Sequence, residues 1–396
     1  MVTLDSISKK ITKGTTPTSV GCAFESSGVN FIKSESLGHG KSVDRSKFAF
    51  ISAQTHERLK RSQIAENDIL FSMAGMFLGK TSIATPEILP ANTNQAVAII
   101  RIDHQKANYE YVYYYLNQRS VIQAINVSSA QSAQPNINLR QIGQIEIDLP
   151  SREMQDKIVA ILASIDKKIE LNQKINDNLE QQAATYFQEL FINNANPMWQ
   201  ISTISDLGTV VGGSTPSKTK PEYYTNNGIA WITPKDLSIN KSKFISHGEN
   251  DITELGLKNS SATVMPKGTV LFSSRAPIGY IAIASNEVTT NQGFKSVIPY
   301  SEIGTAFVYF FLKHSLPVIE SAASGSTFKE ISGSAMKNIP AIIPDRNTLD
   351  QFNSFCAPIF AQQKILEEQN HSLAMLRDSL LPKLMSGAID IASIQL

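Results

Sequence analysis

A chain of 396 residues is long enough for two domains with connecting segments, and 42% hydrophobic and 18% charged residues describe a globular protein with sizeable cores. Two distant cysteines and six scattered histidines argue against a disulfide framework or zinc site, and no apolar run reaches the roughly 18 residues that span a bilayer. The opening MVTLDSISKK lacks a signal peptide's apolar core, so we expect a reduced, cytoplasmic protein without structural metal, and the net charge of +1 does not suggest a nucleic-acid binder.

Residues 1–150 are expected to form a first globe of mixed α/β (α+β) structure. Short runs rich in Val, Ile and Phe, such as DILFS at 68–72 and AVAIIRI at 96–102, alternate with turn residues and predict strands. The stretch YEYVYYYLNQRSVIQAI at 109–125 predicts an amphipathic helix.

One segment of this globe fits a nucleotide-binding pattern. AGMFLGKT at 74–81 has the form A-x-x-x-x-G-K-T, whose chemistry requires a helix N-terminus directly after Lys80. The following SIATPEILP contains Pro86 and Pro90, which disfavour a helix. We therefore expect a tight turn between two strands rather than a phosphate site.

Residues 151–196 predict a long helix with a coiled-coil seam. No Gly or Pro interrupts the stretch from Ser151 to Phe191, and apolar residues recur at heptad spacing. At about 1.5 Å per residue, such a helix is a rod of roughly 60 Å. Its seam positions are Ile158, Leu162, Ile165, Ile169, Leu179, Ala183, Tyr186 and Leu190.

Residues 197–346 repeat the first globe in order, so we expect a second copy of the same fold. The spacing between matching segments drifts only from about 201 to 194 residues, which indicates duplication. The matching pairs are KGTTPT with GGSTPS, NFIKSESL with AWITPKDL, DILFSMAGMFLGKTSIA with TVLFSSRAPIGYIAIA, ANTNQAVAII with TTNQGFKSVI, YVYYYLNQ with FVYFFLKH, and QIGQIEIDLP with SAMKNIPAIIP.

The heptad pattern returns in residues 347–396, which predict a second long helix, kinked at Pro358 or restarting there, and a tail. Its seam positions are Phe352, Ile359, Leu366, Leu373 and Leu380. Two rods with narrow apolar stripes can cover each other as an antiparallel coiled coil, relating the globes by a pseudo-two-fold axis. Asn172, Asn176 and Asn370 fall on or opposite this seam, where a buried Asn fixes register. The alternative is that each rod packs only on its own globe.

Charge is divided unevenly between these segments. The first globe carries 15 Lys and Arg against 12 Asp and Glu, and the second 13 against 11. The first rod carries 5 against 7, and the last fifty residues 3 against 5. Mildly basic globes permit contact with an anion such as DNA, although a solvated surface explains so small an excess almost as well.

The chain resembles the specificity (S) subunits of Type I restriction–modification systems. The resemblance rests on the globe–rod–globe–rod order and on GSTPSK, IAWITPKDL, VLFSSRAPIGYIAI, TNQGFKS and SLLPKLMSGAID, and the first globe departs from it with MAGMFLGKTSIA. It implies two target recognition domains that each read half of a bipartite double-stranded DNA target. It also implies spacer helices that dock two methyltransferase (M) subunits, with restriction (R) subunits joining the complex. S-adenosylmethionine and ATP would belong to those partners, and the chain itself would be non-catalytic and bind no cofactor.

Two other classes compete with this interpretation: a self-contained DNA-modifying enzyme and a protein-interaction scaffold that does not bind DNA. Methyltransferase and nuclease signatures are missing from the sequence, which argues against the first. The basic globes and the family motifs argue against the second. A neighbouring methyltransferase gene would be the simplest discriminating observation.

If the globes read different half-sites, divergent loop positions are the better candidates for base contacts. Ser72 and Met73 are placed opposite Ser274 and Arg275, and Arg275 is the strongest single candidate. Base-reading candidates are Lys33, Ser34, Glu35, Ser72, Met73, Ser129, Gln131, Thr233, Lys235, Asp236, Ser274, Arg275, Ser326 and Thr327. Tyr113, Tyr114 and Tyr115 fit a core role better than base stacking.

The Thr-Asn-Gln segment occurs in both copies and so cannot by itself distinguish two half-sites. We expect it to organise a turn into the following strand, with DNA-backbone or shared-base contact as the alternative. Candidates for backbone contact are Lys13, Lys41, Lys218, Lys220, Asn94, Gln95, Asn291 and Gln292, with ordinary solvated lysines as the alternative for the four Lys.

Overall fold

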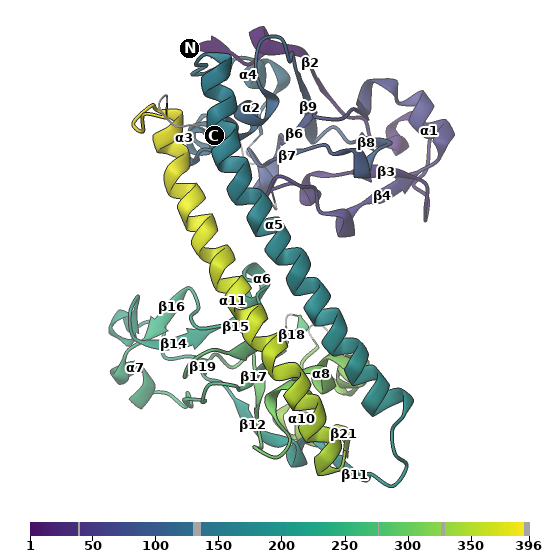
Figure 1. The fold of residues 1–396 in the computed structure, drawn as a ribbon, viewed down its shortest axis with the longest axis vertical. Helices are drawn as coiled ribbons and strands as arrows, with labels where there is room; N and C mark the ends of the chain where they lie inside the picture. The colour runs from purple at the N-terminus through teal and green to yellow at the C-terminus, as the bar shows by residue number, and fades with distance from the viewer. Residues whose placement is uncertain (39, 130–135, 276, 326–328, 392–396) are drawn as a thin grey trace. The chain divides into compact units, whose positions relative to one another are not determined.

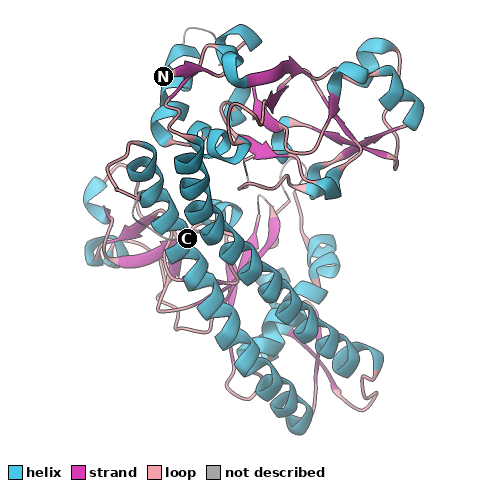
Figure 2. Ribbon diagram, turned by 45° about the horizontal axis from the view of Figure 1, so that its top comes forward, coloured by secondary structure: helices cyan, strands magenta, loops and turns pink. Residues whose placement is uncertain are grey.

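The computed structural model describes residues 1–38, 40–129, 136–275, 277–325 and 329–391. The chain divides into two compact units. Unit 1 comprises Met1–Ile169 with Ser372–Leu396, and unit 2 comprises Glu170–His371. Each unit therefore holds one predicted globe and part of both long helices, and each mixes helices with strands (Figure 2).

The described residues of unit 1 form three small sheets, and Figure 1 labels strands of the two larger ones. Their strand orders are β2-β9-β6-β7, β4-β3-β8-β5 and β1-β10. The β3–β8 pair is parallel and the other pairs are antiparallel. The strands are β1 Val2–Thr3, β2 Ser8–Lys13, β3 Val29–Ile32, β4 Ala49–Ile51, β5 Gln63–Ile64, β6 Ile69–Ser72, β7 Thr81–Ile83, β8 Ala91–Thr93, β9 Val97–Ile102 and β10 Glu146–Ile147.

Unit 2 also contains three sheets, with strand orders β12-β20-β17-β18-β15, β13-β16-β14-β19 and β11-β21. Here β14–β19 and β15–β18 are the parallel pairs. The strands are β11 Gln200–Thr203, β12 Gly208–Gly212, β13 Tyr224–Thr225, β14 Ile229–Ile232, β15 Phe244–Ile245, β16 Asn250–Ile252, β17 Val270–Ser274, β18 Ile278–Ala284, β19 Thr289–Thr290, β20 Lys295–Pro299 and β21 Pro340–Ile343.

The two units share a core topology, to which β13 and β15 are added in unit 2 and β5 in unit 1, so the duplication predicted from the sequence is confirmed. The order β2-β9-β6-β7 in unit 1 corresponds to β12-β20-β17-β18 in unit 2. The parallel pair β3–β8 corresponds to β14–β19. The antiparallel strands β6 and β7 are joined by residues 73–80, which include a 3-10 helix at Gly75–Phe77, so the connection is longer than the expected tight turn. No α-helix follows Lys80, as a phosphate loop would require, because β7 begins at Thr81.

Short helices surround these sheets, and the long helices follow each globe. Unit 1 has α1 Ala53–Arg58, α2 Tyr109–Leu116, α3 Arg119–Ser129 and α4 Leu139–Gly143. Unit 2 has α6 Pro234–Ile239, α7 Glu254–Lys258, α8 Thr305–His314, α9 Leu316–Ala322 and α10 Gly333–Lys337. The long helices are α5 Arg152–Gln188 and α11 Arg346–Met385, and parts of both belong to each unit.

The single helix predicted over 109–125 is in fact two helices. Asn117 ends α2, and its side-chain Nδ2 donates a hydrogen bond to the carbonyl of Tyr113 over 2.7 Å. The same carbonyl also accepts the backbone N–H of Asn117 over 3.2 Å, so both groups of Asn117 close the last turn of α2. In unit 2, Pro317 near the start of α9 likewise begins a new helix after α8.

The long helices pair antiparallel where unit 2 contains both. Asn172 of α5 contacts Gln369 and Asn370 of α11, whereas Asn176 contacts Gln363. Higher numbers on α5 therefore meet lower numbers on α11. Most predicted seam residues lose much of their exposure, and those that are buried are Ile158, Leu162, Ile165, Ala183, Phe352, Ile359 and Leu366. The half-buried ones are Ile169, Leu179, Tyr186, Leu190, Leu373 and Leu380.

The second long helix does not restart at Pro358, because α11 runs unbroken from Arg346 to Met385. Pro382 also lies inside the helix. The helix ends at Met385, just before Gly387, whose φ of 70° is the left-handed conformation that glycine adopts at helix ends.

The two alternatives for helix packing occur together, because the long helices contact each other and also contact the globes. In unit 1, Ile158 and Leu162 of α5 share one apolar cluster with Leu384 of α11 and with Tyr111 of the globe. In unit 2, Phe187 of α5 packs with Phe307, Phe310 and Phe352 at ring-centroid distances of 5.8–5.9 Å. The predicted core role of the three consecutive tyrosines is confirmed, since Tyr113, Tyr114 and Tyr115 are 6%, 2% and 9% exposed.

Candidate nucleic-acid interface

Two loops meet in the same way in each unit. In unit 1, the loop after β2 approaches the turn between β8 and β9, and the Thr15 N–H donates to the Thr93 carbonyl over 3.0 Å. In unit 2, the Ser214 N–H donates to the Thr290 carbonyl over 2.9 Å. The repeated GTTP/GSTP and TNQ sequences are therefore partners, a relation that their separate positions in the sequence did not reveal.

Close approach explains the glycine of the first loop. A Cβ atom on Gly14 would lie 2.0 Å from the Thr93 carbonyl oxygen, and one on Gly213 would lie 2.0 Å from the Asn291 carbonyl oxygen. Such contacts lie far inside the van der Waals limit. Because the obstruction is backbone in both units, only glycine fits these two positions without a shift of the main chain.

The asparagine of each TNQ segment forms the predicted turn. The Asn94 side-chain oxygen accepts the N–H of Ala96 over 3.1 Å, and that of Asn291 accepts the N–H of Gly293 over 2.8 Å. Asparagine stabilises turns by this local hydrogen bond to the backbone two residues on. The interpretation of TNQ as a structural element leading into β9 and β20 is confirmed for the asparagines.

The glutamine beside each asparagine is exposed but held in place. The Thr16 hydroxyl donates to Oε1 of Gln95, and the Thr215 hydroxyl donates to Oε1 of Gln292. With the amide oxygen engaged, each Gln presents its NH₂ group as a donor. Both units thus carry the same surface group that can bind an anion or a base acceptor.

The structure corrects the sequence register around Arg275. The Met73 N–H donates to the Ala96 carbonyl over 2.8 Å, just as the Ser274 N–H donates to the Gly293 carbonyl over 2.7 Å. Met73 is therefore the counterpart of Ser274, and Ala74 is the counterpart of Arg275. The placement of Ser72 and Met73 opposite Ser274 and Arg275 was therefore wrong by one residue, and the LFS match, which aligns Ser72 with Ser273, agrees with the structure.

Arg275 lies beside an acidic residue from a distant part of unit 2. Its Nη1 is 3.4 Å from Oε2 of Glu330, and Nζ of Lys295 is 3.8 Å from Oε1 of the same carboxylate. Side chains of Arg275 and Glu330 are each 37% exposed. Glu330 was not predicted, since 55 residues separate it from Arg275 and no motif marks it.

Three of the predicted base-reading residues are core residues. Ser72 and Ser274 are 0% exposed and Met73 is 6% exposed. A side chain without exposed surface cannot reach a base edge in this conformation. The prediction is therefore wrong for all three, and the physical reason is that each faces inward at the end of a central strand, β6 or β17.

The loop after β14 is also more structural than predicted. Thr233 is the N-cap of α6, and its N–H and hydroxyl both donate to Oδ2 of Asp236, over 2.7 and 2.6 Å. This capping box occupies both polar groups. Lys235 of the same loop is exposed and forms an ion pair of 2.6 Å with Glu249. In unit 1, Lys33, Ser34 and Glu35 are half-buried in and before a short 3-10 turn.

The four predicted backbone-binding lysines differ in their surroundings. Lys218 is exposed and Lys13 is half-buried on β2. Lys41 forms an ion pair with Glu110. Lys220 donates to the Tyr223 hydroxyl over 3.1 Å, a bond that raises the pKa of Lys220.

Four base-reading candidates remain. Ser129 ends α3, while Gln131, Ser326 and Thr327 lie outside the described residues.

A buried polar cluster joins the second globe to the long helices within unit 2. Lys243 forms an ion pair with Glu180 of α5, donates to Oε1 of Gln363 over 2.6 Å, and lies 4.0 Å from the Phe360 ring centroid. Glu180 also accepts from Lys313 over 2.6 Å. Burial lowers the pKa of Lys243, although Glu180 opposes this. Burial alone would raise the pKa of Glu180, but Lys243 and Lys313 together hold it below its usual value.

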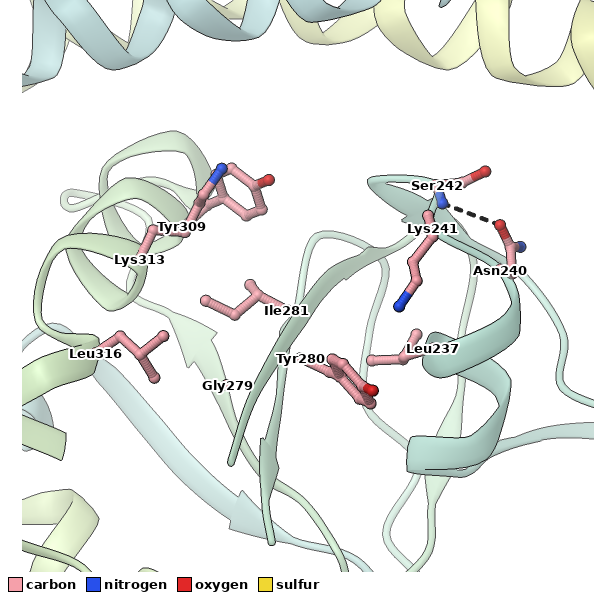
Figure 3. Close-up of a pocket in the computed structure, with 10 residues that line it drawn as sticks. All are labelled: Leu237, Asn240, Lys241, Ser242, Gly279, Tyr280, Ile281, Tyr309, Lys313 and Leu316. Carbon is pink, nitrogen blue, oxygen red and sulfur yellow. Dashed lines mark hydrogen bonds between the residues drawn. The ribbon is translucent and has the colours of Figure 1, made fainter. Parts of the chain in front are cut away.

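A cavity of about 250 Å³ lies beside this cluster (Figure 3). Its lining includes Lys241, Tyr280, Tyr309 and Lys313. Nζ of Lys241 lies 4.7 Å from the Tyr280 ring centroid, so a cation–π contact already engages this lysine. All of its lining residues belong to the second globe, in α6 and the loop after it, β18, α8 and α9.

Within the described part of the chain, no group of three or more His, Cys, Asp or Glu side chains could hold a metal ion. Over the same residues, no helix is both long and apolar enough to cross a bilayer.

A family model described as a Type I restriction modification DNA specificity domain matches the chain twice, over residues 1–181 and 196–370. The Type I restriction enzyme MjaIX specificity subunit of Methanocaldococcus jannaschii is 43% identical over 162 residues, which are 40% of this chain and 37% of that relative. The HindI specificity subunit of Haemophilus influenzae is 24% identical over 330 residues, 64% of this chain and 71% of that relative. The match thus spans little more than a third of the first relative.

A solved structure supports the fold over nearly the whole chain. The S subunit of a Type I restriction–modification system from M. genitalium superposes with a TM-score of 0.55 at 16% identity, covering 96% of this chain and 94% of that one. Similarity at this level of identity shows a shared fold, which agrees with the duplicated α/β units and long helices described above.

Proposed function

The chain belongs to the Type I restriction–modification DNA specificity family, and from this premise we propose that it is the non-catalytic sequence-recognition subunit of a Type I restriction–modification complex. Each unit reads one half of a bipartite double-stranded DNA target. Methylation and cleavage belong to partner subunits, namely two methyltransferase (M) subunits and restriction (R) subunits. S-adenosylmethionine and ATP bind to those partners. The complex works on DNA in the cytoplasm.

This proposal rests on one observation: the two units share the same loop contact, but the side chains beside that contact differ. The Thr–Gln contact recurs in both units, as Thr16–Gln95 and Thr215–Gln292. Beside it, Arg275 of unit 2 occupies the place that Ala74 holds in unit 1. A shared frame can grip the DNA backbone in the same manner twice, while the differing side chains discriminate between bases.

The paired helices α5 and α11 set the spacing of the two half-sites and provide the docking surface for the M subunits. Half-sites separated by about one helical turn of DNA, roughly 34 Å, present the same face of the duplex to both readers. The helices themselves are acidic, with 5 basic against 7 acidic residues over 151–196, which suits contact with protein rather than with phosphate.

The proposal is tested by expressing the chain with the M subunit encoded in the same genome and mapping methylated bases. We expect methylation at a two-part motif with a fixed gap, and none when the M subunit is expressed alone. An uninterrupted motif would contradict two separate readers. Methylation by the chain alone would instead identify a self-contained enzyme, and failure to associate with M or DNA would favour a scaffold unrelated to DNA.

A further inference from the structure

One charged cluster distinguishes the two units at otherwise equivalent positions. It consists of Arg275, Glu330 and Lys295 and is called the unit 2 triad below. The backbone that carries it is duplicated: Arg275 forms an isolated antiparallel bridge with Glu330, and Ala74 forms the same bridge with Asn136 in unit 1. The third position, Lys295, corresponds to the buried Ala98, since both are three residues beyond the Gln of TNQ.

The backbone around Glu330 holds it firmly. Glu330 and Ser324 exchange two backbone hydrogen bonds of 2.9 and 3.1 Å, and the next residue, Ile331, donates its N–H to the Ser274 carbonyl over 3.0 Å. The main chain of Glu330 is therefore fixed beside Ser274, the last residue of β17. Lys295 engages Oε1 of Glu330 and Arg275 engages Oε2.

This arrangement leaves part of the guanidinium available. Among the residues that the structure describes, only Nη1 of Arg275 forms such a contact, with Glu330, so Nη2 and Nε keep donors that can face a ligand. Two adjacent donors match the O6 and N7 acceptors that guanine presents in the major groove. An arginine held at one end by a carboxylate loses less conformational entropy on binding than a free one.

We propose that Arg275 reads a guanine in the half-site of unit 2, and that Glu330 and Lys295 are positioning residues that aim its guanidinium. This inference rests on the proposed function. It also explains why unit 1 reads a different sequence, because Ala74, Asn136 and Ala98 provide neither the guanidinium nor its support. Glu330 additionally repels phosphate, which keeps Arg275 from serving as a nonspecific backbone contact.

The test measures methylation of a plasmid library randomised in both half-sites, using the full chain with its M subunit. We expect Arg275→Ala to reduce the preference for guanine at one position of one half-site by about ten-fold or more. Glu330→Gln should relax the same position, and Glu330→Asp should restore it in part. Lys295→Met should give a weaker effect at the same position. The other half-site should be unchanged in all four variants.

The control is Glu254→Gln, which removes an exposed carboxylate of α7 in unit 2 that is not among the predicted contact residues. It should leave every position unchanged, and thermal unfolding of each variant reports whether unit 2 remains folded. Equal loss at all positions in Arg275→Ala would make Arg275 a phosphate contact and overturn the proposal. Wild-type discrimination in Glu330→Gln would overturn the role of Glu330. Absence of any bipartite motif with the unaltered chain would instead refute the proposed function itself.

Discussion

Asn172 is completely buried between α5 and α11, and its Nδ2 donates a hydrogen bond of 2.9 Å to Oδ1 of Asn370. Gln363 of α11 donates to the carbonyl of Asn176 over 3.1 Å one turn further along α5. Amide groups thus replace apolar contacts in this part of the seam. Displacing one helix against the other would leave these buried groups unpaired, which costs about 1–3 kcal/mol for each group.

Replacing Asn172 should affect the stability of the protein and the alignment of α5 with α11 in different ways. We expect Asn172→Leu to keep or raise the free energy of unfolding, because an apolar side chain suits a seam position better than a polar one. The helices should, however, lose their single alignment. Spin labels at the exposed positions Gln173 and Glu368 would report this as a broader distance distribution. A distribution as narrow as in the unaltered chain, with lowered stability, would show that Asn172 only fills space.

Periodicity and repetition were sufficient to predict the long helices, the duplicated globes and the turn role of Asn94 and Asn291. They failed where distant residues meet. Phe187 lies outside the predicted heptad positions yet is 4% exposed, because it packs on the globe as well as on α11. Likewise, Glu330 could not be associated with Arg275, nor Thr16 with Gln95, since tertiary pairing and not local pattern brings them together.

Two neighbouring glycines allow a matched test of the close approach between the repeated loops. Gly213→Ala would place a Cβ atom 2.0 Å from the Asn291 carbonyl oxygen, whereas a Cβ on Gly212 would meet nothing within 4 Å. We expect Gly213→Ala to lower the free energy of unfolding by about 1–3 kcal/mol or more, as overpacking does. Gly212→Ala should change it by less than about 0.5 kcal/mol. Chemical denaturation followed by circular dichroism measures both, and equal effects would contradict the close approach of the two loops at Gly213.

The ion pair of Glu180 with Lys243 predicts how unit 2 responds to acid. Glu180 has a folded-state pKa below its usual value of 4.5, so its stabilising effect is complete above pH 4.5 and is lost as the pH falls through the folded pKa. We expect Glu180→Gln to lose less stability than the unaltered chain between pH 6 and about 3.5. At pH 6 the variant should be less stable by roughly 3 kcal/mol, since it leaves Lys243 buried without its carboxylate.

Thermal unfolding at the two pH values measures this difference, with Glu249→Gln as the control because its ion pair is exposed at both ends. The control should follow the unaltered chain at both pH values. An identical acid response in Glu180→Gln and the unaltered chain would show that other carboxyl groups dominate the transition. Glu367 is not such a group, because burial raises its pKa, so its protonation stabilises the folded state and opposes the effect of Glu180 in this range.

The equivalent glutamines of the two units should contribute equally to DNA binding, whatever the DNA sequence. Gln95 and Gln292 each offer an NH₂ group whose orientation a threonine hydroxyl fixes. A hydrogen bond to a charged acceptor such as phosphate contributes about 1.5–3 kcal/mol, so Gln95→Ala and Gln292→Ala should each weaken DNA binding by about ten-fold or more. Thr215→Val, which removes only the hydroxyl, should give a smaller loss in the same direction as Gln292→Ala.

Binding of the complex with M to target and non-target duplexes measures this effect by fluorescence anisotropy at several salt concentrations. The fold-loss should be the same on both duplexes. The salt dependence should be unchanged, because a neutral side chain releases no counterion, whereas a lysine contact would reduce the slope by about one. Gln105→Ala is the matched control, since Gln105 is an exposed glutamine of unit 1 outside both repeated loops. A loss confined to one half-site sequence would instead make the glutamine a reader of bases, and the repeated turn would then contribute to specificity.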